Sequence, residues 1–97
     1  GQWVMEHPIP DTLVINIGDL MHRWTNARFN SNPHRVVNAS GRERYSIAVF
    51  FDPHPDTIVD PRDLLDDPSE AKYPPITCGD YIVQRFDKAF KYRQQKP

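Results

Sequence analysis

The chain has 97 residues, enough for one small domain. Its 12 Lys and Arg residues nearly balance 13 Asp and Glu residues, and they are interspersed, so the one-sided basic footprint of a nucleic-acid-binding protein is absent. The single cysteine, Cys78, excludes an internal disulfide framework and a cysteine-based zinc site, and no apolar run approaches the ~20 residues that span a bilayer. We therefore expect a cytoplasmic protein with neither a nucleic-acid nor a membrane partner.

The start of the chain is unusual for a complete protein. Gly1-Gln2-Trp3-Val4 has no initiator Met and is typical of the interior of a strand, so we expect a fragment of a longer protein. Ten prolines against four glycines favour a β-rich fold over a helical bundle, because proline marks strand ends and stiff loops.

The first half alternates predicted strands with polar turns. Residues 12–16 form a β-branched, apolar run that predicts a strand, followed by a turn at 17–19. Residues 20–25 are ambiguous between strand and helical turn, and residues 26–33, with three Asn and a closing Pro, are typical of a loop. Two further strands are predicted at 34–37 and 44–51, joined by a polar turn at 38–41.

The second half is predicted to be a long excursion followed by a helix. Residues 52–73 contain four prolines and many acids, which indicates a surface segment with one short strand at 57–59. Thr77 and Asp80 have the spacing of a capping box. The apolar stripe that follows has helical spacing and predicts core packing; it comprises Ile82, Val83, Phe86, Ala89 and Phe90.

One strand carries a candidate carboxylate clamp. Because side chains alternate along a strand, Arg44 and Ser46 share one face with Ala48 and Phe50. A guanidinium fork beside a hydroxyl on an apolar face suits a carboxylate, which Arg can hold through two hydrogen bonds. Taken alone, an Arg-x-Ser pair is more often an ordinary surface feature. A lone histidine such as His34 is likewise more often a surface or packed residue than a metal ligand.

The order and spacing of several segments, including the ten-residue step from His34 to Arg44, resemble the C-terminal core of the isopenicillin N synthase-like family of Fe(II) and 2-oxoglutarate oxygenases. The resemblance runs through residues 13–19, Trp24-Thr25-Asn26, residues 31–36, Arg44-Tyr45-Ser46, residues 50–53 and residues 73–81. It implies a mainly β fold, the C-terminal half of a double-stranded β-helix (jelly roll) with a C-terminal α-helix. Residues 1–60 would be rich in strands, 61–76 a loop, and about 78–93 a helix.

By that resemblance, His34 corresponds to one histidine of the two-histidine, one-carboxylate set that holds Fe(II). Arg44 and Ser46 correspond to the pair that binds the far carboxylate of 2-oxoglutarate. The whole protein would couple the oxidative decarboxylation of 2-oxoglutarate by O₂ to the oxidation of a small organic substrate. The missing N-terminal part would supply the rest of the site.

The chain departs from the family pattern in two places. The His-x-Asp pair that completes the metal site precedes the matching histidine in the family, and no such pair precedes His34. The His54-Pro55-Asp56 segment follows His34 within the proline-rich stretch, so we expect it not to bind metal, and we expect His7 and His22 to be surface or structural residues. Ala27 stands where the family often carries Gly, which indicates an altered turn.

Two alternatives stay open. Some members of the family keep iron without 2-oxoglutarate, either gripping a substrate carboxylate with the Arg-x-Ser pair or using ascorbate. The chain could also be a non-catalytic, truncated β domain, because one histidine holds iron poorly and half a jelly roll leaves strand edges unpaired.

Overall fold

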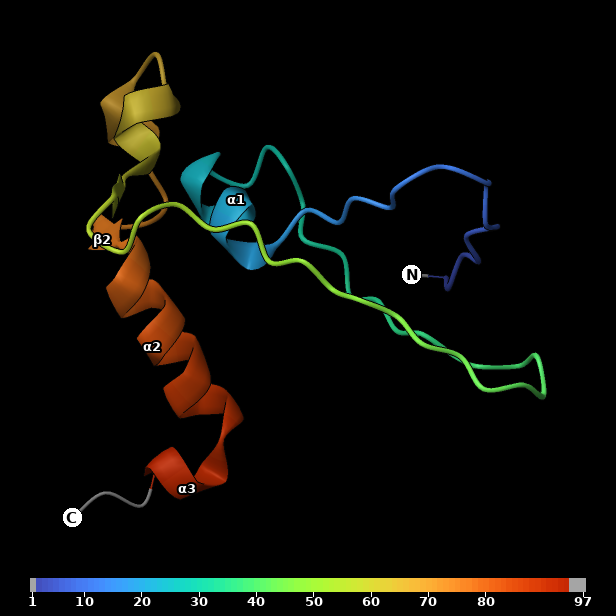
Figure 1. The fold of residues 1–97 in the computed structure, drawn as a ribbon. Helices are drawn as coiled ribbons and strands as arrows, with labels where there is room; N and C mark the ends of the chain where they lie inside the picture. Colours follow the sequence, from blue (N-terminus) through green and yellow to red (C-terminus); the bar gives the residue numbers. More distant parts are fainter. Residues whose placement is uncertain (1, 95–97) are drawn as a thin grey trace.

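A computed structural model describes residues 2–94; Gly1, the first residue of the predicted fragment start, and residues 95–97 lie outside the described part. Figure 1 shows a helical and turn-rich part, from which the N-terminal segment and a long hairpin run away; the two arms of the hairpin carry residues 34–37 and 44–51, on either side of the turn at 38–41. The elements, in order, are α1 (Asp19–Trp24), β1 (Ile58–Val59), η1 (Pro61–Leu64), η2 (Pro68–Glu70), β2 (Ile76–Thr77), α2 (Cys78–Ala89) and α3 (Lys91–Gln94). Within residues 2–94, no helix has the length and apolar character needed to cross a bilayer.

The described sheet is one short antiparallel ladder beside a small core. Ile58 pairs with Thr77 and Val59 with Ile76, so the short strand predicted at 57–59 is confirmed as β1. Its partner β2 lies at the end of the predicted 61–76 loop and was not expected. Val59 and Cys78 have no exposed surface, and burial together with the Asp52 carboxylate raises the pKa of the Cys78 thiol. The thiol is therefore neutral and packed.

The predicted loop at 61–76 contains two turns of 3₁₀-helix that begin in the same way. Asp60 and Asp67 each accept a hydrogen bond from the backbone N–H two residues ahead, and a Pro opens each turn. Pro is well placed there because the first N–H groups of a helix have no partner within it. The repeated Asp-Pro pair is the sequence signal for both turns.

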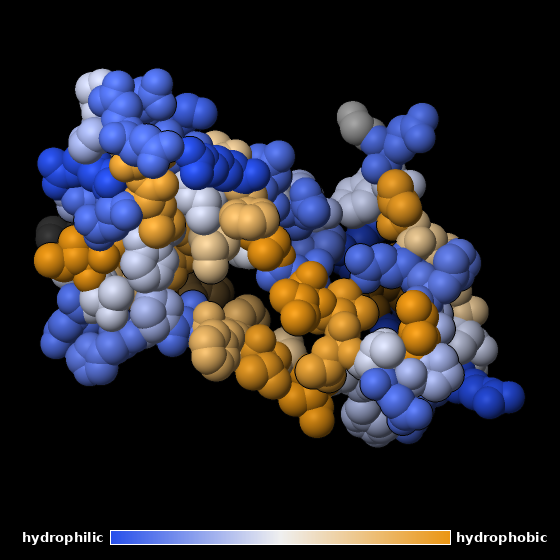
Figure 2. Space-filling model, turned by 90° about the horizontal axis from the view of Figure 1, so that it is seen from above, coloured by the Kyte–Doolittle hydropathy of each residue, from blue (hydrophilic) through white to orange (hydrophobic). Residues whose placement is uncertain are grey.

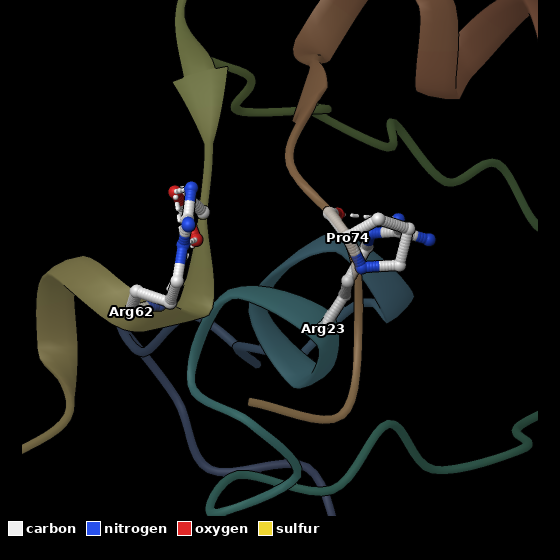
Figure 3. Close-up of polar contacts among 4 residues, drawn as sticks. Arg23, Arg62 and Pro74 are labelled. Atoms are coloured by element: carbon white, nitrogen blue, oxygen red, sulfur yellow. Dashed lines mark hydrogen bonds and ion pairs between the residues drawn. The ribbon is translucent and has the colours of Figure 1, made fainter. Parts of the chain in front are cut away.

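The carboxylate of Asp60 also binds the side chain of Arg62. Arg62 donates from Nε to both carboxylate oxygens at 3.0 Å and from a terminal nitrogen at 2.6 Å (Figure 3). These side-chain bonds lower the pKa of the Asp60 carboxyl, while burial acts in the opposite direction. The pair holds the turn that follows β1.

The start of α2 is as predicted, and its end is earlier than predicted. The Thr77 hydroxyl accepts from the Asp80 N–H at 3.2 Å, as expected of an N-cap. The next free N–H groups, of Cys78 and Gly79, donate to the carbonyls of Thr57 and Pro55, each at 2.9 Å. The single helix expected to about residue 93 instead breaks at Phe90, after which α3 turns back and Arg93 binds Asp87.

The apolar stripe of α2 is not core in this structure. Val83, Phe86 and Phe90 keep close to half of their surface exposed, because no described element covers that face of the helix. Phe86 and Phe90 instead contact each other, with ring centroids 5.9 Å apart. The prediction of core packing for this stripe is therefore wrong for the described chain.

The three strands predicted at 12–16, 34–37 and 44–51 form no ladder in the described residues, which corrects the expectation of a strand-rich first half. A strand is stable only when a neighbouring strand takes up its backbone N–H and C=O groups, and these segments have no such neighbour here. Their apolar side chains stay in solvent: Leu13 is 89%, Ile47 93% and Phe51 98% exposed. Figure 2 shows apolar side chains exposed across the middle of the molecule.

The ambiguous segment at 20–25 is helix α1, which ends in a left-handed turn. The Asn26 N–H donates to the carbonyl of Arg23 and the Ala27 N–H to that of His22, the two bonds of a Schellman motif. Asn26 and Ala27 have φ angles of 56° and 66°. Asn is common at such a position, whereas Ala meets a steric cost, so the departure noted at Ala27 falls on a strained residue.

Replacing Ala27 with Gly should therefore stabilise the protein. The left-handed conformation costs a non-glycine residue about 1–2 kcal/mol, and the extra chain entropy of Gly offsets part of that gain, so we expect roughly 0.5–1 kcal/mol. Chemical denaturation measures it. The matched control is Ala39→Gly, at a position with a negative φ angle, which should give no gain. Equal effects at both positions would contradict the strain at Ala27.

Arg62 should control the pKa of Asp60. Because the pKa of Asp60 is lowered in the folded chain, the pair stabilises the fold above the ordinary carboxyl pKa, and this contribution is lost as the pH falls through the lowered value. Arg62→Leu should raise the pKa of Asp60, since burial then acts without the opposing guanidinium. NMR titration of the carboxyl carbon measures the shift. Arg42→Leu is the control that should leave it unchanged, and an unchanged pKa in Arg62→Leu would rule the pairing out.

Candidate functional site

The predicted metal ligand His34 is exposed and held in one tautomer by its own loop. Its ring Nδ1 lies 2.9 Å from the backbone carbonyl oxygen of Asn32. A carbonyl can only accept, so in the neutral imidazole the ring proton is on Nδ1 and the lone pair of Nε2 is free. This is the state in which histidine binds a metal, with the second nitrogen donating to a carbonyl or carboxylate.

The predicted co-substrate clamp lies on the second extended arm. Arg44 and Ser46 are exposed, and neither side chain has a hydrogen bond or ion pair within residues 2–94. The predicted polar turn between the arms is confirmed: Asn38 donates to the Arg42 carbonyl at 2.7 Å, and Gly41 takes a φ of 71° (Figure 1). The turn keeps His34 and Arg44 on successive arms, but no contact links them in the described part of the chain.

The residues that the structure describes do not assemble a metal site by themselves. No group of three His, Cys, Asp or Glu side chains that could hold a metal is present among the described residues. His54 accepts a hydrogen bond from the Asp56 N–H at 3.1 Å, within a local exposed turn. The imidazole of His34 is a donor that suits Fe(II), and within residues 2–94 it belongs to no group of three such side chains.

Four residues at the end of α1, here called the α1 anchor (His22, Arg23, Thr25 and Asn26), make contacts that the sequence analysis did not predict. Arg23 donates to the carbonyl of Pro74 at 2.8 Å (Figure 3). Its guanidinium also lies over the rings of Tyr73 and Tyr81, 5.4 and 5.8 Å from their centroids. Arg23 thus attaches α1 to the segment that leads into α2.

Asn26 binds the same segment through both ends of its amide. The nitrogen donates to the carbonyl of Glu70 at 3.1 Å, and the oxygen accepts from the N–H of Lys72 at 2.8 Å. The residue is only 9% exposed, so these bonds are shielded from water. Asn is the residue type that can both take the left-handed turn and bridge a donor and an acceptor.

His22 and Thr25 hold the loop that runs from α1 to His34. The Thr25 hydroxyl accepts from the Phe29 N–H at 3.1 Å, and the His22 Nδ1 accepts from the Ser31 N–H at 3.4 Å. The Nε2 of His22 lies 3.3 Å from the Tyr73 hydroxyl. The prediction that His22 is a surface or structural residue agrees with these contacts. Two anchor residues, Thr25 and Asn26, belong to the Trp24-Thr25-Asn26 part of the family resemblance, which is the sequence feature that could have indicated these contacts.

A cleft of about 260 Å³ lies between α1 and α2, beside the α1 anchor. Asp19, Arg23 and Arg85 are among its lining residues. Arg85 is paired with Asp19 across the cleft, and Arg23 is committed to Pro74. The ion pair of Asp19 and Arg85 therefore joins the two helices. Burial is the main cause that raises the pKa of the neighbouring Tyr81.

Comparison with known proteins identifies the class. Residues 1–53, just over half of the chain, match the model of the 2OG-Fe(II) oxygenase superfamily, and the chain belongs to that family. His34, Arg44 and Ser46 all fall within the matched residues. The family uses Fe(II) and 2-oxoglutarate and has a jelly-roll fold.

Several characterised relatives are similar over most of this chain. A 2-oxoglutarate-Fe(II) type oxidoreductase, hxnY, of Emericella nidulans is 41% identical over 98% of this chain and 29% of its own length. Homoarginine-6-hydroxylase 2-ODD-233 of Oryza sativa is 38% identical over 88% of this chain and 26% of its own. Feruloyl CoA ortho-hydroxylase 2 of Arabidopsis thaliana is 36% identical over 92% of this chain and 25% of its own.

The chain thus spans less than a third of the length of these relatives. No solved structure matches it significantly. The comparisons confirm the family expected from the residues, whereas the roles of His34, Arg44 and Ser46 stay predictions.

Removing the Asn26 amide should loosen the attachment of α1 to the segment at 70–74. Asn26→Gly keeps the left-handed turn and deletes both hydrogen bonds, so we expect a loss of roughly 1–3 kcal/mol in the free energy of unfolding. Chemical denaturation measures it. Asn38→Gly, which removes bonds within an exposed turn, is the matched control and should change stability by less than about 0.5 kcal/mol. Equal losses would contradict the role of Asn26.

Proposed function

We propose that this chain supplies one iron ligand and the co-substrate clamp of an Fe(II) and 2-oxoglutarate-dependent oxygenase. The observation that carries the proposal is the family match over residues 1–53, which includes His34, Arg44 and Ser46. The free Nε2 of His34 supports the metal role. The unpaired guanidinium of Arg44 in the described chain supports the clamp, because it is available to a carboxylate.

In this proposal the residues of the chain bind and orient rather than transfer protons. His34 holds iron through Nε2 while Nδ1 stays bonded to the Asn32 carbonyl. Arg44 binds the far carboxylate of 2-oxoglutarate through two hydrogen bonds, and the Ser46 hydroxyl donates a third. When bound, the iron supplies the chemistry that couples decarboxylation of 2-oxoglutarate by O₂ to oxidation of the substrate.

The finer fold belongs to the same proposal. Residues 12–16, 34–37 and 44–51 would become jelly-roll strands by pairing with strands of a longer protein, which would also carry the remaining iron ligands. Pairing would put Arg44 and Ser46 on one face of the sheet, beside the iron that His34 would bind. It would also cover the apolar side chains that are now exposed. We place such a protein in the cytoplasm, an expectation supported only by the single cysteine.

The substrate would be a small organic molecule oxidised by hydroxylation, desaturation or demethylation. For hydroxylation, the support comes from the names of relatives, which include a homoarginine hydroxylase, a gibberellin dioxygenase and a feruloyl CoA hydroxylase. These substrates differ widely from one another, so they indicate the size class and not the identity of the substrate.

The test is anaerobic binding of Fe(II) and 2-oxoglutarate to the full-length protein. We expect a visible charge-transfer band that is lost in His34→Ala. Arg44→Ala should weaken 2-oxoglutarate binding about 10- to 100-fold, since a hydrogen-bonded charge pair contributes roughly 1.5–3 kcal/mol. Arg42→Ala, on the same exposed arm, is the matched control and should bind normally.

Two outcomes would contradict parts of the proposal. Unchanged Fe(II) affinity in His34→Ala would remove the metal role of that residue. Unchanged 2-oxoglutarate affinity in Arg44→Ala, with iron still bound, would favour the alternative in which the pair grips a substrate carboxylate or the co-substrate is ascorbate. A full-length protein that binds no iron would favour the non-catalytic alternative.

A further inference from the structure

The ring of His22 connects α1 with the loop at Ser31 and with the distant segment at Tyr73. It lies on α1, its Nδ1 faces the backbone N–H of Ser31 at 3.4 Å, and its Nε2 faces the hydroxyl of Tyr73 at 3.3 Å. The rings of His22 and Tyr73 also meet edge to face, with centroids 6.3 Å apart. The imidazole is thus held from both sides.

The two contacts define the tautomer of His22. A backbone N–H can only donate, so the Ser31 contact requires an unprotonated Nδ1. The ring proton then lies on Nε2, which donates to the Tyr73 hydroxyl oxygen. This is the opposite tautomer to that of His34, whose proton is on Nδ1. Each ring is therefore oriented by a different backbone group of the same loop.

The loop beyond Ser31 leaves little freedom before His34. Only Asn32 and Pro33 intervene, and proline restricts its own φ angle to about −65°. The Asn32 carbonyl is the group that binds Nδ1 of His34. A shift of Ser31 therefore moves the acceptor that sets the orientation of the His34 ring.

We propose that His22 is a positioning residue for the iron ligand His34. It acts through Ser31 and Asn32, and Tyr73 fixes its ring, so that the segment leading into α2 helps to place the metal ligand. The inference rests on the proposed metal role of His34. Outer partners that orient a ligating histidine typically change metal affinity by about 10- to 100-fold when they are removed.

Paired substitutions distinguish positioning from general support of the fold. Asn places its side-chain oxygen near the position of Nδ1, so His22→Asn can still accept from Ser31, whereas Gln places its polar group near the position of Nε2. His22→Leu removes both contacts. Tyr73→Phe removes only the hydroxyl that fixes the ring. His54→Leu, at an exposed histidine, is the matched control.

The experiment is anaerobic Fe(II) titration of the full-length variants, with the charge-transfer band in 2-oxoglutarate and the melting temperature of the metal-free protein recorded for each. We expect Fe(II) binding to weaken about 10-fold or more in His22→Leu and His22→Gln and to stay within about threefold of wild type in His22→Asn. Tyr73→Phe should give a smaller loss, and His54→Leu none. The band should shift in the weakened variants.

The outcomes separate this inference from the proposed function. Wild-type affinity in His22→Leu would overturn it, and so would equal losses in the Asn and Gln variants that follow the melting temperature, since these indicate only a structural role. If His22→Leu does not fold, the comparison of Asn with Gln decides. A wild-type protein without iron binding refutes the proposed function itself, whereas iron binding that depends on His34 but not on His22 refutes only this inference.

Discussion

The arrangement of the described chain depends on one amide, that of Asn26. Its two hydrogen bonds reach Glu70 and Lys72, 44 and 46 residues further along the chain. With Arg23 on Pro74, they hold α1 against the segment that enters α2. The fully buried core comprises little more than Val59, Pro61 and Cys78, so apolar burial alone provides few long-range contacts. Shielded polar bonds therefore contribute much of the tertiary arrangement.

The α1 anchor also connects the loop that carries His34 with the segment that leads into α2. Thr25 and His22 hold the loop that carries His34, while Arg23 and Asn26 hold the segment before α2. The extended arm with Arg44 and Ser46 is not held in this way, because the described residues offer its backbone no ladder partner. The described chain thus holds the loop before His34 in place, whereas the arm that carries Arg44 and Ser46 has no such support.

Local signals in the sequence were reliable wherever the bonds they require are local. The Thr77 cap and the polar turn at 38–41 were predicted correctly, since each depends on neighbouring groups, and the short strand at 57–59 forms because residues 76–77 pair with it. The strands at 12–16, 34–37 and 44–51 were predicted from residue preference and are not formed. Preference describes which residues suit a pleated sheet, but only a partner strand can satisfy their backbone groups.

By itself the sequence determined the family, the candidate residues His34, Arg44 and Ser46, and the caps and turns, because residue type and spacing carry that information directly. Only the tertiary structure decided the contacts that the α1 anchor makes with Glu70, Lys72 and Pro74. These depend on where a carbonyl or an amide from a distant segment comes to lie. Spacing along the chain does not encode such a position, because it arises only when the segments at 22–26 and 70–74 pack together.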